Sequence, residues 1–151
     1  MSAAAAGSQK SLMDLVLLLN RLALGLYFVL AGVHKISAEG GVAQFYRTVF
    51  LSMKPAWLPV WFAAPYGYAL PFLEVIVGGL LGLGALGRWP AGAMSLMLAS
   101  FTIALYENGK FFSDQGPFHA NVILLTSALL LTMTGHGAIS VDAFRKKGAA
   151  Q

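Results

Sequence analysis

The sequence has no cysteine, and only 11% of its 151 residues are charged. The missing cysteine excludes disulfide bonds, thiol relays, cysteine-bound zinc and iron–sulfur clusters. The scarcity of charge, with 58% hydrophobic residues and a mean hydropathy of +0.71, excludes the surface of a water-soluble domain. Basic residues are not interleaved with aromatic ones in a nucleic-acid-binding pattern, so the expected partner is a lipid bilayer and not a nucleic acid.

Four apolar stretches are long enough to cross a bilayer, at about 12–36, 68–87, 89–106 and 117–136. Prolines and aromatic residues between the first two stretches indicate a short segment at the membrane interface. The sequence therefore predicts an all-α, polytopic membrane protein built as a four-helix bundle. Its expected organisation is a flexible N-terminal tail at 1–11, a transmembrane domain at 12–142 and a basic C-terminal tail at 143–151.

Four spans place both termini on the same side of the membrane. The positive-inside rule favours a cytoplasmic location for them, by five basic residues to four, and we expect a multi-pass protein of the inner cell membrane. The five are Lys10, Arg88, Arg145, Lys146 and Lys147, and the four on the other side are Lys35, Arg47, Lys54 and Lys110.

Arg21 and Glu74 interrupt the first and second spans. Each charge costs roughly 2.5–3.5 kcal/mol at the centre of a bilayer helix, so each needs a partner or a task. Small residues at helical spacing accompany them, as in Gly25 and Gly32, and we expect the two charges to meet at a helix seam. The pair has two interpretations. It fixes the helix register, or it forms a catalytic site in which Glu74 exchanges protons and Arg21 sets its charge.

Further polar residues are expected near the end of the bundle that lies away from the termini. Lys35, His34, His119 and Asn121 are candidates for cofactor binding, with Asn121 orienting a ligand. A quinone is the candidate cofactor. Haem or metal ligation by His34 and His119 is disfavoured because no carboxylate is spaced to support these histidines, and no metal is predicted.

Three motifs resemble the DoxX family. They are Arg21-Leu-Ala-Leu-Gly25 followed by Phe28, Gly32 and Lys35; Pro71-Phe-Leu-Glu74 with Gly78-Gly79 and Gly82-Leu-Gly84; and Asn121 with the run 135–142. The resemblance implies a four-helix inner-membrane bundle whose relatives include small subunits of quinone-linked oxidoreductases. It also implies that Arg21, Lys35, Glu74 and Asn121 occupy the polar positions of that family.

The expected function is that of a small subunit or anchor of a membrane-bound, quinone-linked oxidoreductase complex, and at most an accessory subunit as an enzyme. Its partners are then membrane or peripheral proteins, and the glycine-rich helices favour a homo-oligomer. Two alternatives stay open at this point. In the first, the polar residues only fix the helices of a scaffold or assembly factor against one another. In the second, they line a small carrier, which is the weaker hypothesis because the sequence has four spans without repeats.

Overall fold

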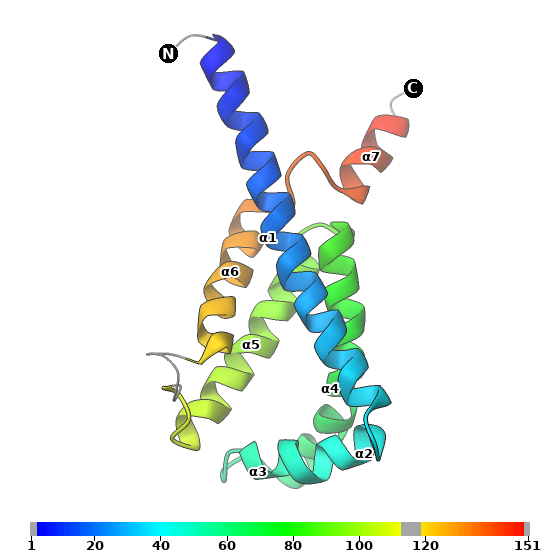
Figure 1. Ribbon diagram of the computed structural model, residues 1–151, viewed down its shortest axis with the longest axis vertical. Helices are drawn as coiled ribbons and strands as arrows, with labels where there is room; N and C mark the ends of the chain where they lie inside the picture. Colours follow the sequence, from blue (N-terminus) through cyan, green and yellow to red (C-terminus); the bar gives the residue numbers. More distant parts are fainter. Residues whose placement is uncertain (1–2, 113–118, 150–151) are drawn as a thin grey trace.

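The computed structural model describes residues 3–112 and 119–149, and within these ranges the chain forms helices and no strand. Four helices lie along the long axis of the molecule (Figure 1): α1 (Ala3–Ser37), α4 (Val60–Leu83), α5 (Trp89–Glu107) and α6 (Ala120–Thr134). Between α1 and α4 lie α2 (Gly41–Phe45), the π-helix η1 (Tyr46–Phe50) and α3 (Leu51–Met53), and α7 (Val141–Gly148) ends the chain. The all-α prediction is confirmed.

Three of these helices are long and apolar enough to cross a membrane: Gly7–Ser37 within α1, then α4 and α5. Their length and apolar composition indicate a polytopic membrane protein. The 15-residue α6 is apolar but shorter, so a fourth crossing stays a prediction. At 35 residues α1 extends over about 52 Å, more than the roughly 30 Å of a hydrocarbon core, and its first turns project beyond the other helices (Figure 1).

Helix α4 begins at Val60, eight residues before the expected start of the second span, and contains Pro65 and Pro71. Pro59 precedes it in an extended conformation, which lets the helix start there. Proline lacks an N–H, so each of the two internal prolines removes a helical hydrogen bond. A helix in a membrane bundle tolerates such losses because neighbouring helices satisfy the freed backbone groups. The prolines therefore do not mark the helix boundary that the sequence suggests.

Glycines bring α1 and α4 into close contact. A Cβ added at Gly25 would lie 2.6 Å from the carbonyl oxygen of Gly78, and one at Gly32 would lie 2.5 Å from that of Pro71. Without a hydrophobic effect between helices in lipid, such close packing is what holds two helices together. The predicted small-residue faces of the first two spans therefore do meet.

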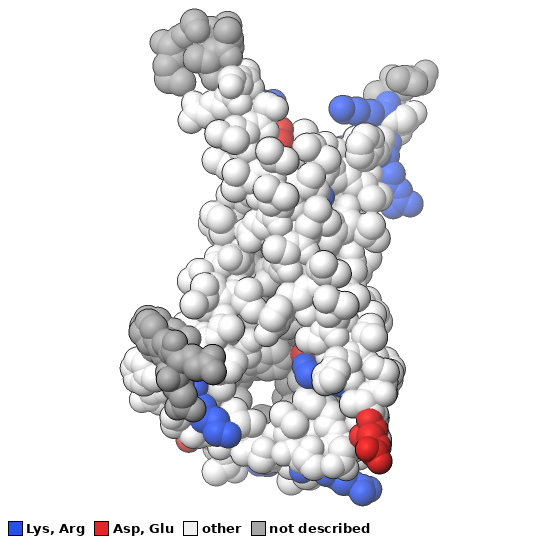
Figure 2. Space-filling view, viewed as in Figure 1, with Lys and Arg blue, Asp and Glu red and all other residues white. Residues whose placement is uncertain are grey.

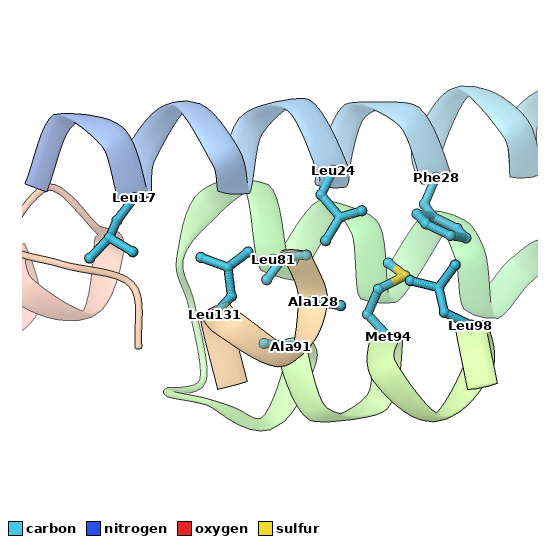
Figure 3. Packing of buried hydrophobic residues seen from close by; sticks show 9 residues of the cluster. All are labelled: Leu17, Leu24, Phe28, Leu81, Ala91, Met94, Leu98, Ala128 and Leu131. Atoms are coloured by element: carbon cyan, nitrogen blue, oxygen red, sulfur yellow. The ribbon is translucent and has the colours of Figure 1, made fainter. Parts of the chain in front are cut away.

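The core lies where these two helices meet α5 and α6 (Figure 3). Phe28 and Leu24 of α1 pack against Met94 and Leu98 of α5, and Ala128 of α6 is fully buried beside them. The hairpin from α4 to α5 turns through Gly84 and Gly87, both with positive φ. A glycine adopts that conformation without strain, which permits the short connection between the two helices.

The segment from α2 to α3 crosses the end of the molecule that lies away from the termini, where α4 and α5 diverge (Figure 1). Tyr46 stacks on Tyr68 of α4, with ring centroids 4.4 Å apart. A Cβ at Gly67 would come within 2.6 Å of the Phe50 ring and 2.8 Å of the Tyr46 ring. The aromatic rings of this segment thus pack against a glycine of α4. This contact holds the segment across the end where α4 and α5 diverge.

Candidate functional site

A lysine and a glutamate form a salt bridge between α1 and α4. Nζ of Lys35 donates to both carboxylate oxygens of Glu74, at 2.5 and 2.6 Å. The Glu74 side chain is 1% exposed and that of Lys35 is 24% exposed. The glutamate is therefore shielded on all sides by protein, while the lysine reaches it from a more open position.

The local packing explains why these two residues meet. Gly32 precedes Lys35 by three residues on α1, and its missing side chain lets α1 approach the backbone of α4 next to Glu74. The Lys35 ammonium also lies over the ring of Phe45 in α2, 5.1 Å from its centroid. Such a cation–π contact stabilises a partly desolvated lysine, so the crossing segment helps to hold the pair.

A cavity of about 710 Å³ lies next to this pair, between α4, α5, the crossing segment and the start of α6. Figure 2 shows the molecule hollowed at this end. Aromatic and aliphatic side chains form most of its wall, among them Phe62, Phe101 and Trp57. Mostly apolar pockets of this size with a few placed polar groups are typical of small-molecule sites.

The polar groups of the cavity come from four helices and from two lysines outside the helices, Lys54 and Lys110. Lys35 lies at its wall, and the hydroxyl groups of Tyr66 and Ser100 are hydrogen-bonded to each other at 2.8 Å. His119 and Asn121 line it at the start of α6, where Nδ1 of His119 accepts the backbone N–H of Asn121 at 3.3 Å and caps the helix. These groups can donate to the carbonyl oxygens of a ligand.

A second, smaller pocket of about 300 Å³ is lined by His34, Glu39 and Gln44 on the far side of Lys35. Lys35, Phe45 and Val49 line both pockets. These three side chains therefore form the wall between the large cavity and a polar pocket.

Arg21 and Glu74 do not meet, so the expected ion pair between them is wrong. Arg21 lies fourteen residues before Lys35 on α1, about 21 Å along the axis, and is 2% exposed. Its guanidinium donates to three backbone carbonyl oxygens, at 3.1 Å to Gly82, 2.6 Å to His136 and 2.7 Å to Ile139. The buried charge is therefore satisfied by backbone carbonyl oxygens of α4 and of the C-terminal segment, and not by the Glu74 carboxylate that both interpretations required.

Other residues fasten the same segment. Asp14 accepts the backbone N–H of Ala138 at 2.8 Å, and Asp142 accepts that of Gly87 at 2.6 Å. This hydrogen bond from Gly87 holds the pKa of Asp142 below its usual range. Burial, helped by the nearby guanidinium of Arg21, lowers the pKa of His136, whose Nε2 lies 3.5 Å from the Asp142 carboxylate. We define residues 135–142 as the C-terminal strap.

The structure thus groups the predicted site residues in two places. Lys35, His119 and Asn121 line the cavity, Glu74 is bound to Lys35, and His34 lines the smaller pocket, whereas Arg21 of α1 is bound to the strap. Within the described residues, no three His, Asp or Glu side chains gather as metal ligands. Sequence reasoning missed Tyr66 and Ser100. Ser100 carried a signal, a hydroxyl in an apolar span, but Tyr66 is one of many aromatic residues in its stretch.

A family model described as "Methylamine utilisation protein MauE" matches residues 13–133, more than three quarters of the chain. No curated protein and no solved structure matches. The match overturns the resemblance to DoxX. Glycine seams serve close helix packing in lipid, and intramembrane charges occur wherever other groups of a protein satisfy them, so unrelated bundles share both features that carried this resemblance. The matched range contains the salt bridge and the cavity.

Proposed function

The chain belongs to the MauE family, and from this premise we propose that it is a membrane accessory protein of an oxidoreductase system that holds a quinone beside Lys35 and Glu74. The family's description supports the redox setting, because the utilisation of methylamine, a reduced one-carbon amine, requires its oxidation. The observation that carries the proposal is the salt bridge at the wall of the 710 Å³ apolar cavity.

The residues present fit a quinone. Its two carbonyl groups need hydrogen-bond donors, which Lys35, Tyr66, Asn121 and His119 offer from different sides of the cavity. Its apolar ring and tail need walls such as those of Phe62 and the neighbouring side chains. When bound, a quinone supplies the acceptance and release of electrons and protons.

In this proposal Lys35 and Glu74 have separate roles. The ammonium of Lys35 donates to a ligand carbonyl in place of one carboxylate oxygen of Glu74, and Glu74 then holds a proton close to the ligand. Lys35 lines both pockets, so its side chain links the buried carboxylate to the large cavity and to the pocket of His34 and Glu39. The long side chain of Lys35 is suited to this because it is the more exposed member of the pair.

Tryptophan fluorescence tests the proposal. Of the three tryptophans, Trp57 lines the cavity, so the variant Trp61→Phe/Trp89→Phe carries a reporter at the site only. We expect saturable quenching by decylubiquinone in detergent, weakened at least tenfold by Lys35→Met. The matched control is Lys10→Met, the same change at the opposite end of α1, which leaves the titration unchanged. Linear, unsaturable quenching that is identical in all three proteins would contradict quinone binding.

The second candidate function is that of a scaffold or assembly factor. The observation that favours it is that both oxygens of Glu74 are already satisfied by Lys35, without a ligand. In that case Glu74→Gln lowers the yield of the assembled partner complex but leaves the turnover of each assembled complex intact. A loss of turnover at unchanged assembly favours the quinone site instead. Pull-down from native membranes in mild detergent, followed by activity per complex, separates the two.

A further inference from the structure

The positive charge of the protein is concentrated at one end. The end that carries the termini, α7 and the α4–α5 hairpin has six basic residues and two carboxylates, Asp14 and Asp142. The described residues of the other end have four basic residues and three carboxylates, Glu39, Glu74 and Glu107. On the visible face of the molecule, the basic groups of the first end gather on α7 (Figure 2).

In the described part of the chain, neither carboxylate at this end forms a salt bridge with a lysine or arginine, although the charge of Arg145 acts on Asp142. Asp14 is bound to the backbone N–H of Ala138 and Asp142 to that of Gly87. Arg21 is buried on carbonyl oxygens. Among the residues that the structure describes, no salt bridge is formed by the remaining five basic side chains, Lys10, Arg88, Arg145, Lys146 and Lys147. This end therefore attracts anions.

Large apolar side chains are exposed next to these cations. Phe144 of α7 is 65% exposed, and Trp89, two residues after Gly87, is 83% exposed. Val141 and Phe144 are three residues apart and share one side of α7, whereas Asp142 is turned to the hairpin. An amphipathic helix of this kind, with aromatic residues at the same level, is suited to the boundary between headgroups and acyl chains.

We propose that α7 and the hairpin form a binding surface for the headgroups of anionic phospholipids in the membrane that the helices cross. Charge selects the partner, because each lysine or arginine near an anionic leaflet contributes about 1 kcal/mol of attraction. The exposed Phe144 and Trp89 decide for a lipid and against a nucleic acid or an acidic protein segment, because they need an apolar layer beside the phosphates. The strap holds α7 in place for this contact through Asp142 and the Ser140 cap.

Quenching of Trp89 by brominated lipids tests this surface. The variant Trp57→Phe/Trp61→Phe leaves Trp89 as the single tryptophan, and dibromo-phosphatidylglycerol is titrated against dibromo-phosphatidylcholine in detergent. We expect the anionic lipid to quench at a lower concentration. Adding Lys146→Gln/Lys147→Gln should weaken its binding roughly tenfold or more, since two attractive charges are lost.

The matched control removes two basic residues at the opposite end, Arg47→Gln/Lys110→Gln, and should preserve the preference for the anionic lipid. Equal quenching by both lipids, or an equal loss in the control, would overturn the proposal. Inorganic phosphate at the lipid's concentration should not displace the brominated lipid. If it does so completely, the surface is a site for free phosphate, and the lipid proposal fails. None of these readouts depends on quinone binding.

Discussion

The backbones of Gly25 and Gly78 touch across the α1–α4 seam, so that the carbonyl oxygen of each lies within 2.8 Å of the place where a Cβ of the other would be. Neither position has room for a methyl group while the two helices keep their separation. The seam also aligns Lys35 with Glu74, because Gly32 belongs to the same line of contact.

Gly25→Ala or Gly78→Ala is therefore expected to push the two helices apart and to destabilise the protein by about 1–3 kcal/mol. Gly79→Ala is the matched control, because a Cβ at Gly79 meets nothing within 4 Å. The midpoint of thermal unfolding in detergent measures the difference. Equal midpoints for Gly78→Ala and Gly79→Ala would show that the backbones of α1 and α4 are not in close contact at Gly78.

The two members of the salt bridge should respond unequally to removal. Lys35→Met leaves a carboxylate buried without a partner, at a cost of about 3–5 kcal/mol, whereas Glu74→Gln leaves a lysine that can turn to the smaller pocket. The double variant Lys35→Met/Glu74→Leu should recover most of the loss, because apolar residues replace the buried pair. Thermal midpoints of the three variants test this order. A double variant as unstable as Lys35→Met would refute the explanation by an unpaired charge.

Arg21→Lys should release the C-terminal strap without affecting the cavity. A lysine ammonium cannot donate along three separate directions to Gly82, His136 and Ile139 as the guanidinium does. Hydrogen exchange is expected to rise at 135–142, while quenching of Trp57 by decylubiquinone stays as in the parent. Weakened quinone binding together with unchanged exchange would place Arg21 in the site after all.

Acid should loosen the strap through His136. Its pKa is lowered by burial and by Arg21, so the docked strap favours the neutral imidazole. The docked strap is then most stable at a pH above the ordinary histidine pKa of about 6.5. Its stability declines as the pH falls from there towards the lower pKa that His136 has in the docked state. The contribution of Asp142, whose pKa is also lowered, is lost only at more acidic pH, as the pH falls through its value in the docked state.

The measurement is hydrogen exchange at 135–142 at pH 7.5 and pH 5.5, corrected for the intrinsic rate. We expect a several-fold rise in opening at the lower pH, and none in His136→Gln, which keeps the backbone carbonyl that Arg21 needs. A rise of the same size in His136→Gln would assign the pH response to another group.

The features that could be predicted from the sequence are those that follow from apolar composition and helix periodicity. Runs of apolar residues predicted the helices, and glycine spacing predicted the seam, because helix periodicity decides which residues share a face. Lys35, His119 and Asn121 were likewise expected near one end of the bundle, where they now line one cavity. Arg21 and Lys35 lie on the same face of α1, about 21 Å apart.

Helix periodicity does not determine which group each charged side chain binds. Two cations of the facing helix, Arg21 and Lys35, share the face that meets Glu74, and the seam places Glu74 next to Lys35 and not Arg21. The acceptors of Arg21 are backbone carbonyls of the strap, and every residue type provides such a group. No sequence pattern marks them. The hydrogen bond between the hydroxyl groups of Tyr66 and Ser100 could not be predicted either, since no sequence pattern marks two hydroxyl groups on different helices as partners.

The bonds of Arg21 to the strap also constrain the order of biogenesis. Two of its acceptors follow it by 115 and 118 residues in the chain, so at roughly 5–20 residues per second the ribosome needs about 6–24 s to produce both. During this interval the guanidinium has at most one of its three acceptors, the carbonyl oxygen of Gly82. The insertion machinery is therefore expected to shelter this helix from lipid until residues 136–139 have been synthesised.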